Sequence, residues 1–257
     1  MVQSERQPLS LSAQPFHRIL IAMQRRDVSI LQHAKNEHGG LFEEYIRERG
    51  MELRHVPIYE TNEIPPVTTT HLLLMGGPMS VNDEEELPWL NTEKQIIREW
   101  VAKGRPVLGI CLGAQLIASS FEAPVYPCEA ELGWSPVTAA KSEIFPGLPE
   151  QFKVFQMHGE TFGIPHAATL VYRGKRVANQ ALCMGSALGL QFHIELTLEM
   201  IRDWISDRPS KEQSSVLTQS RQYLPESQRI CRVVADRFLS APCGNFTWMH
   251  PAGQGSG

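Results

Sequence analysis

The chain has 257 residues, of which 42% are hydrophobic and 20% charged, and its 24 lysines and arginines against 28 aspartates and glutamates give a formal net charge of −4. This ordinary globular composition excludes a disordered or fibrous chain. The mild acidity, without a long basic run, argues against nucleic acid or an anionic membrane as a partner. The longest apolar runs, such as 72–75 and 107–112, are too short to span a bilayer.

The first half of the chain alternates predicted strands and helices after a loose leader at residues 1–15. A continuous apolar run predicts a strand buried on both faces at 17–23, and further strands are predicted at 52–59, 71–75 and 106–110. Apolar residues at helical spacing predict helices at 39–50, 88–103 and 111–119. This alternation predicts an α/β fold whose open, mostly parallel sheet is flanked by helices.

The second half contains more strands and ends in helices. Short strands are predicted at 124–129, 133–139, 152–157, 168–172, 180–184 and 188–192. Helices are predicted at 197–205 and 216–239, the second interrupted by Pro225. Residues 241–257, glycine-rich and aperiodic, predict a flexible tail. Since no repeat or linker divides the chain, we expect residues 16–240 to form a single domain.

The cysteines do not suggest disulfide bonds or a metal site. They stand at wide, irregular spacing at Cys111, Cys128, Cys183, Cys231 and Cys243. An odd number is no disulfide framework, and no CxxC or HxxxH pair offers the spacing of metal ligands. The polar N-terminus lacks the apolar core of a signal peptide. We therefore expect a reducing, cytoplasmic setting, in which one cysteine can serve as a nucleophile.

Cys111 lies in the most informative segment, a Gly-x-Cys-x-Gly turn between a predicted strand and a predicted helix. The same arrangement carries the serine of Gly-x-Ser-x-Gly hydrolases. Because Gly109 and Gly113 lack a Cβ, strand and helix can approach closely while Cys111 adopts a strained conformation. The sulfur then projects from the carboxyl end of the sheet, where the helix N-terminus favours a thiolate. The alternative is a cysteine that is merely buried, and the flanking glycines favour the nucleophile.

His193 and Glu195 are the predicted base and its orienting group. A cysteine nucleophile needs a histidine whose ring is held by a third group. Residues two apart in a strand share a face, so these two side chains can form a hydrogen bond. They follow a predicted strand, as Cys111 does, which favours a shared site over an unrelated surface pair.

Gly76-Gly77-Pro78 ends another predicted strand. Glycines at a strand end let a backbone N–H point at a ligand, and Leu112, the residue after the nucleophile, offers a second N–H. Two such donors could bind an oxyanion. A tight turn without a function is the alternative interpretation of the glycine pair.

Segments in this order resemble the class I glutamine amidotransferases, enzymes with a Cys–His–Glu triad, and are most similar to the glutaminase domain of GMP synthase. The resemblance covers roughly residues 17–206. The similar segments are Gly-Ile-Cys-Leu-Gly-Ala-Gln at 109–115, Gln-Phe-His-Ile-Glu at 191–195, Met-Gly-Gly-Pro at 75–78, Met-His-Gly-Glu-Thr-Phe at 157–162 and Glu-Leu-Gly-Trp-Ser-Pro-Val at 131–137.

The resemblance implies a flavodoxin-like fold and a role for each matching residue. It assigns Cys111 as nucleophile, His193 as general base and acid, Glu195 as its partner, Gly77 and Leu112 as oxyanion donors, and Gln115, His158, Gly159, Glu160 and Thr161 as substrate-binding residues. The implied reaction is attack of the thiolate on a γ-carboxamide, formation of a γ-glutamyl thioester with loss of ammonia, and release of glutamate by water. It needs no metal or organic cofactor.

Departures from the family pattern leave alternatives open. Ile194 replaces the proline usual between the histidine and the glutamate, and no P-loop or synthetase domain follows Glu195. We therefore expect a stand-alone form that acts on glutamine or another γ-glutamyl small molecule, with or without a separate synthetase that accepts the ammonia. The alternatives are a γ-glutamyl peptidase acting on peptides such as glutathione conjugates, and a non-catalytic regulatory module.

Overall fold

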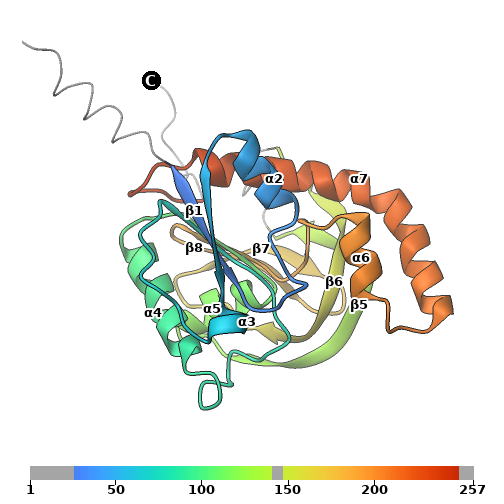
Figure 1. Ribbon diagram of the computed structural model, residues 1–257. Helices are drawn as coiled ribbons and strands as arrows, with labels where there is room; N and C mark the ends of the chain where they lie inside the picture. Colours follow the sequence, from blue (N-terminus) through green and yellow to red (C-terminus); the bar gives the residue numbers. More distant parts are fainter. Residues whose placement is uncertain (1–25, 141–146, 249–257) are drawn as a thin grey trace, which may run out of the picture.

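The computed structural model describes residues 26–140 and 147–248, which fold around one nine-stranded sheet (Figure 1). The strand order is β2-β1-β3-β4-β9-β8-β7-β5-β6. The strands are β1 (Asp27–Gln32), β2 (Glu52–Pro57), β3 (His71–Leu74), β4 (Val107–Ile110), β5 (Val125–Ala139), β6 (Gln151–Phe162), β7 (Thr169–Gly174), β8 (Asn179–Met184) and β9 (Ala187–Leu190). The helices are α2 (Leu41–Glu48), α3 (Ile58–Thr61), α4 (Trp89–Ala102), α5 (Leu112–Ser120), α6 (Leu198–Trp204) and α7 (Ser210–Ser240).

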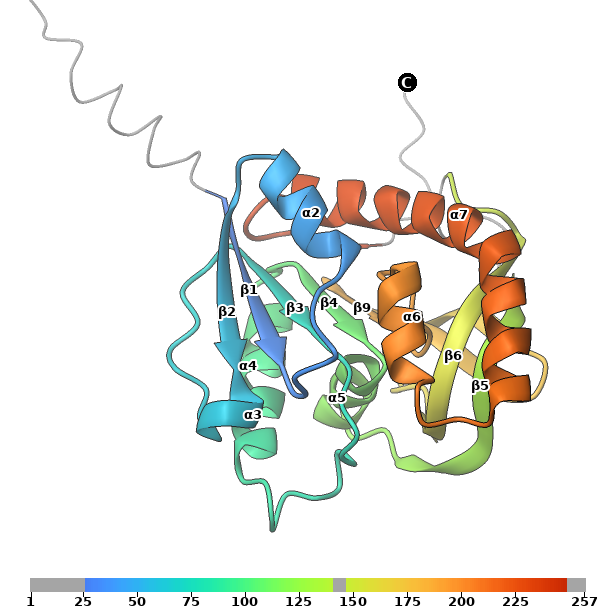
Figure 2. The same ribbon diagram turned by 45° about the vertical axis from the view of Figure 1, so that its right-hand side comes forward.

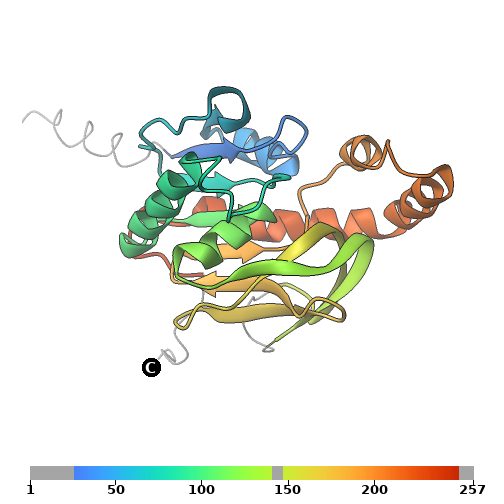
Figure 3. The same cartoon turned by 90° about the horizontal axis from the view of Figure 1, so that it is seen from below.

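The sheet has a parallel half and an antiparallel half. Strands β2, β1, β3, β4 and β9 pair in parallel, and β9, β8, β7, β5 and β6 pair in antiparallel fashion. Figure 3 shows the blue and green parallel strands passing into the long, curved yellow-green and yellow strands. The predicted open α/β sheet flanked by helices is therefore confirmed, with its parallel strands in the first half of the chain and in β9.

Helices cover both faces of the central parallel strands β3 and β4, which explains their continuous apolar runs. On β3, Leu73 packs in the core cluster that contains residues of α2 and α7. Its neighbours Leu72 and Leu74 pack in the cluster that contains residues of α4 and α5. Because successive side chains of a strand point to opposite faces, a strand covered on both sides must be apolar throughout. None of the described helices is both long and apolar enough to cross a membrane.

The first described strand differs from the sequence prediction. The run at 17–23 lies outside the described residues, and β1 begins at Asp27. Buried polar residues interrupt its apolar pattern, yet each has a partner within the fold. The Asp27 carboxylate accepts from the Thr70 N–H at 2.8 Å, and the Ser29 hydroxyl accepts from the Thr69 hydroxyl at 2.9 Å. These long-range hydrogen bonds allow polar side chains in a buried strand, and local sequence does not reveal them.

Several elements of the second half are longer than predicted, among them β6, which ends at Phe162 instead of residue 157. The strands expected at 124–129 and 133–139 are one strand, β5, whose pairing with β6 shifts register between Pro127 and Glu131. Pro225 lies inside α7 and does not end it. A proline within a helix removes one backbone hydrogen bond and bends the axis, and Figure 2 shows α7 changing direction about halfway along its length.

The end of the described chain packs against the domain, so a flexible tail from residue 241 is wrong for 241–248. Trp248 is fully buried, and its indole N–H donates to the Ser186 carbonyl at 2.9 Å. Its ring stacks on Phe238 of α7 with a centroid distance of 6.2 Å and an interplanar angle of 7°. The predicted leader at 1–15 and the remainder of the predicted tail lie outside the described residues.

Candidate active site

Cys111 occupies a strained turn at the carboxyl end of β4. Its φ of 52° and ψ of −104° lie outside the common regions for a residue with a side chain, and it is the N-cap of α5. A Cβ at Gly109 would overlap the Gly113 carbonyl, and a Cβ at Gly113 would overlap the Leu74 carbonyl. The close approach predicted for these glycines is therefore present. It holds the thiol at the end of the sheet.

His193 is held from several sides just after β9. Its Nδ1 lies 2.7 Å from Oε1 of Glu195, and the other carboxylate oxygen accepts the Ile194 N–H at 3.0 Å. The backbone N–H of His193 donates to the Phe155 carbonyl at 2.9 Å. The Trp204 ring contacts the imidazole edge-on, with a distance of 4.8 Å between the ring centroids. These contacts fix the tautomer and the orientation of the ring.

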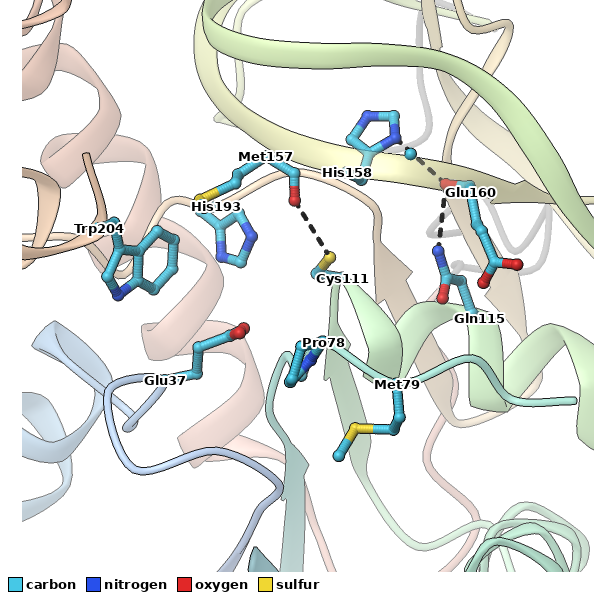
Figure 4. Close-up of a pocket in the computed structure, with 12 residues that line it drawn as sticks. Glu37, Pro78, Met79, Cys111, Gln115, Met157, His158, Glu160, His193 and Trp204 are labelled. Atoms are coloured by element: carbon cyan, nitrogen blue, oxygen red, sulfur yellow. Dashed lines mark hydrogen bonds between the residues drawn. The ribbon is translucent and has the colours of Figure 1, made fainter. Parts of the chain in front are cut away.

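Cys111 and His193 face one another across one pocket (Figure 4). Burial alone lowers the pKa of His193, but the Glu195 charge and the hydrogen bond and charge of the Cys111 sulfur together raise it well above its usual value. Gln191 donates its amide N–H to the sulfur at 3.7 Å. An imidazole that is readily protonated beside a sulfur is the arrangement needed for proton transfer during nucleophilic attack.

Gly77 and Leu112 are neighbours beside this pair. A Cβ at Gly77 would lie 2.9 Å from Cδ2 of Leu112, and a Cβ at Gly76 would lie 3.4 Å from Cε1 of His193. Gly77 lines the pocket. Leu112 is the first residue of α5, so its N–H has no acceptor within the helix. Gly77 and Leu112, which come from separate elements, therefore pack against each other beside Cys111.

The pocket has a volume of about 210 Å³, smaller than the roughly 300–1,000 Å³ common for sites that bind drug-sized molecules. Its lining residues come from the carboxyl ends of the parallel strands, from β6 and from the end of α6. They are Glu37, Gly77, Pro78, Met79, Cys111, Gln115, Met157, His158, Gly159, Glu160, His193 and Trp204. Within the described ranges, no group of three or more His, Cys, Asp or Glu side chains could hold a metal ion.

Gln115, Gly159 and Glu160, which the resemblance assigns to substrate binding, line the same pocket as Cys111. The Gln115 amide donates to the Glu160 carbonyl at 3.1 Å, and the Glu160 carboxylate accepts the Ser80 hydroxyl at 3.2 Å. Thr161 is different. It is buried outside the pocket lining, and its hydroxyl donates to the Asn179 carbonyl at 3.5 Å. The structure therefore does not bring Thr161 to the pocket with its neighbours.

The ring of His158 points away from Cys111 (Figure 4). Its Nδ1 lies 3.1 Å from the Glu160 carbonyl, and its Nε2 lies 3.1 Å from the Gln156 amide oxygen and 3.3 Å from the Glu131 carboxylate. Both ring nitrogens are thus occupied within β5 and β6. His158 shapes the pocket wall through its backbone, and its ring holds the two strands together.

Glu37 and Trp204 line the pocket but lie outside every segment that the sequence analysis singled out for the site. Glu37 belongs to the loop between β1 and α2, and its carboxylate points toward His193 (Figure 4). Burial raises the pKa of Glu37, the His193 charge opposes that rise, and the Glu195 charge adds to it. Glu37 follows β1, and a position just after a strand would have made it a candidate. The sequence analysis predicted that strand at 17–23, whereas β1 is Asp27–Gln32.

Comparison with known proteins places the chain among the glutamine amidotransferases. The family model described as glutamine amidotransferase class-I matches residues 40–205. The glutamine amidotransferase-like protein YfeJ of Salmonella typhimurium is 28% identical over 189 residues, which cover 69% of this chain and 79% of YfeJ. The glutamine-hydrolysing GMP synthase of Thermomicrobium roseum is 36% identical over 129 residues, which cover 49% of this chain and only 23% of that enzyme.

Solved structures agree with the family comparison. A glutamine amidotransferase from Thermotoga maritima has a TM-score of 0.78 and 29% identity, covering 85% of this chain and 100% of that one. Another, from Methylobacillus flagellatus, has a TM-score of 0.77 and 26% identity, covering 90% of this chain and 98% of that one. In both cases the fold is shared over nearly the whole of the neighbour.

Proposed function

The chain belongs to the class I glutamine amidotransferase family, and we propose that it hydrolyses a γ-glutamyl amide through a thioester on Cys111. Glutamine is the first substrate we assign, and the products are ammonia and glutamate. The observation that carries this proposal is the position of His193, with Nδ1 2.7 Å from the Glu195 carboxylate and the other edge of its ring toward Cys111 in the pocket. These are the parts that nucleophilic catalysis by a thiol requires.

In the first half of the proposed reaction, the Cys111 thiolate attacks the γ-carbonyl carbon. The carbonyl oxygen becomes an oxyanion, which accepts hydrogen bonds from the backbone N–H groups of Gly77 and Leu112. The His193 imidazolium gives its Nε2 proton to the departing nitrogen, so ammonia leaves and the γ-glutamyl group remains as a thioester. Glu195 holds the Nδ1–H throughout and balances the charge of the ring.

In the second half, water replaces the amine. Neutral His193 takes a proton from the water as its oxygen attacks the thioester carbonyl, and the same two N–H groups hold the new oxyanion. Collapse of this intermediate breaks the carbon–sulfur bond, releases glutamate and returns the thiolate beside an imidazolium. The carboxylate of Glu160, which already accepts the Ser80 hydroxyl, offers an acceptor for the α-ammonium of the glutamyl group.

The pocket supports a second candidate, a γ-glutamyl peptidase. Beyond His193, the group that protonates the leaving nitrogen, the lining continues to Trp204 and Glu37. That extension gives room for a leaving group larger than ammonia, such as the amine of a peptide. The same chemistry applies to both substrates, and only the leaving nitrogen differs. The GMP synthase relatives suggest, in addition, a separate synthetase that accepts the ammonia.

The test is a glutamate-release and ammonia-release assay over glutamine and a panel of γ-glutamyl peptides. We expect release with wild-type protein, no turnover with Cys111→Ala, and unchanged turnover with Cys243→Ser, which alters an exposed cysteine outside the pocket. Ammonia and glutamate from glutamine identify an amidase, and glutamate without ammonia from a peptide identifies a peptidase. Turnover that persists in Cys111→Ala, or a wild-type protein that cleaves no substrate of the panel, would refute the proposal.

A further inference from the structure

A second histidine–carboxylate pair lies buried beside the glycine segment of the site. His33 follows β1 and Glu93 lies on α4, and both side chains are inaccessible to solvent. The Nε2 atom of His33 lies 3.1 Å and 3.0 Å from the two Glu93 oxygens. The Trp89 ring stacks on the imidazole with a centroid distance of 5.4 Å. Neither member of the pair lines the pocket, and the mechanism above does not use them.

The surroundings of His33 indicate that both ring nitrogens carry a proton. Nδ1 lies 3.0 Å from the Met75 carbonyl and 3.3 Å from the Gly76 carbonyl. A carbonyl only accepts, so Nδ1 donates, and Nε2 likewise faces a carboxylate. Burial alone lowers the pKa of His33, but Glu93 and the two carbonyls raise it overall. The His33 ring also interacts electrostatically with Glu37.

The contact between His33 Nδ1 and the Gly76 carbonyl affects the orientation of the Gly77 N–H. The Gly76 carbonyl and the Gly77 N–H belong to one planar peptide unit, in which oxygen and hydrogen point to opposite sides. A donor that holds the oxygen toward His33 therefore turns the N–H away from His33. Two adjacent glycines restrain the rotation of the peptide between them only weakly. A hydrogen bond from outside the segment is therefore needed to keep that peptide in one orientation. A Cβ at Gly77 would lie 2.9 Å from the His33 Cβ, which shows how closely the two segments pack.

We propose that the His33–Glu93 pair is a positioning element that holds the Gly76–Gly77 peptide with the Gly77 N–H turned toward the oxyanion. This inference rests on the proposed function, in which that N–H is a donor. Glu93 keeps His33 protonated and fixes its ring, and Nδ1–H fixes the peptide. Because the oxyanion exists only during the reaction, loss of the hold lowers kcat and leaves substrate binding nearly unchanged.

The variant that tests the proposal is the double substitution His33→Leu/Glu93→Met. It removes both partners together, so no lone charge stays buried, and apolar replacement of a buried ion pair is often tolerated. The variant His33→Asn/Glu93→Met restores one N–H donor near the position of Nδ1. The matched control is His71→Leu, since His71 is also buried but lies at the opposite, amino end of β3. Thermal unfolding establishes that each variant is folded.

Three quantities are compared: kcat and KM for glutamine hydrolysis, and the rate at which iodoacetamide alkylates Cys111. Alkylation displaces iodide at a saturated carbon, so it needs the thiolate but forms no oxyanion. We expect the double variant to lose roughly 10- to 100-fold in kcat, somewhat less than the about 10²–10³ for deletion of one oxyanion donor. KM and the alkylation rate should change little. The asparagine variant should regain part of the kcat, and His71→Leu should match wild type.

A double variant with wild-type kcat would overturn the proposal. A parallel fall in kcat and alkylation rate would also overturn it, because general damage to the site would then explain the loss. If wild-type protein cleaves no γ-glutamyl substrate, the proposed function fails instead, and the ¹⁵N spectrum of labelled His33 then decides. A proton on Nδ1 at neutral pH supports the positioning element, and an Nδ1 without a proton refutes it.

Discussion

The hydrogen bonds of Glu195 make Glu195→Gln the sharpest perturbation of the site. One carboxylate oxygen accepts from His193 Nδ1–H at 2.7 Å, and the other accepts the Ile194 N–H at 3.0 Å. An amide NH₂ group cannot accept, so the glutamine must place its oxygen on the Ile194 N–H and its NH₂ on Nδ1. Nδ1 then becomes an acceptor, and the ring proton moves to Nε2. In that tautomer His193 cannot take a proton from the thiol or from water.

The expected loss follows from this reversed tautomer. A wrongly oriented base in a comparable triad costs about 10⁴-fold in kcat, which corresponds to about 5.5 kcal/mol at 1.36 kcal/mol per tenfold change in rate. The fold should persist, because the side chain keeps its size and a neutral group replaces a charged one at a buried position. The Glu195 charge also raises the pKa of His193, so the imidazolium itself should become less stable in the variant.

The assay is glutamate release at saturating glutamine, with Glu199→Gln as control because Glu199 is exposed on the neighbouring helix α6. A second readout is the free energy of unfolding against pH. Since the folded-state pKa of His193 lies above its usual 6.5, its contribution is complete below about pH 6.5 and is lost as pH rises through the folded-state value. The variant should lack much of this dependence. Activity of Glu195→Gln within tenfold of Glu199→Gln would refute the reasoning.

Further predictions concern the nucleophile and the stability of the fold. We expect a glutamine-directed epoxide to label Cys111 in preference to the other four cysteines; peptide mass spectrometry checks this, and labelling of Cys243 alone would contradict it. Burial lowers the pKa of His71 to about 4. Neutral His71 therefore contributes up to about 3 kcal/mol to the free energy of unfolding above pH 6.5, and this contribution is lost as the pH falls toward 4. His71→Leu should reduce the slope of the unfolding free energy against pH between about 4 and 6.5, and an unchanged slope would count against the shift. Because Trp248 is fully buried, we expect Trp248→Ala to lower the free energy of unfolding by about 3–5 kcal/mol in urea, whereas a loss below about 1 kcal/mol would mean that 241–248 does not dock.

Local patterns predicted most of the parallel strands and singled out the segments that carry Cys111, His193 and Glu195. A strand covered on both faces must be apolar at every position, so β3 and β4 are visible in the sequence. The positions on both sides of Cys111 must be glycine, because a Cβ there would overlap neighbouring backbone atoms. Such a constraint is visible in a few adjacent residues of the sequence. The spacing of His193 and Glu195 likewise permits their hydrogen bond within one short segment.

Other features depend on partners that are distant in the chain, and only the tertiary structure decided them. Groups about 40 residues away satisfy the buried Asp27 and Ser29 side chains of β1. Because that strand was predicted at the wrong place, the sequence analysis missed both Glu37 and His33. Thr161 shares a segment with Glu160 but turns to Asn179 instead of the pocket. Trp248 is ordered by carbonyls of β4 and of the residue before β9. Which side chains are buried, and which distant groups they hydrogen-bond, depends on how the helices and strands pack against one another. A short stretch of sequence does not contain that information.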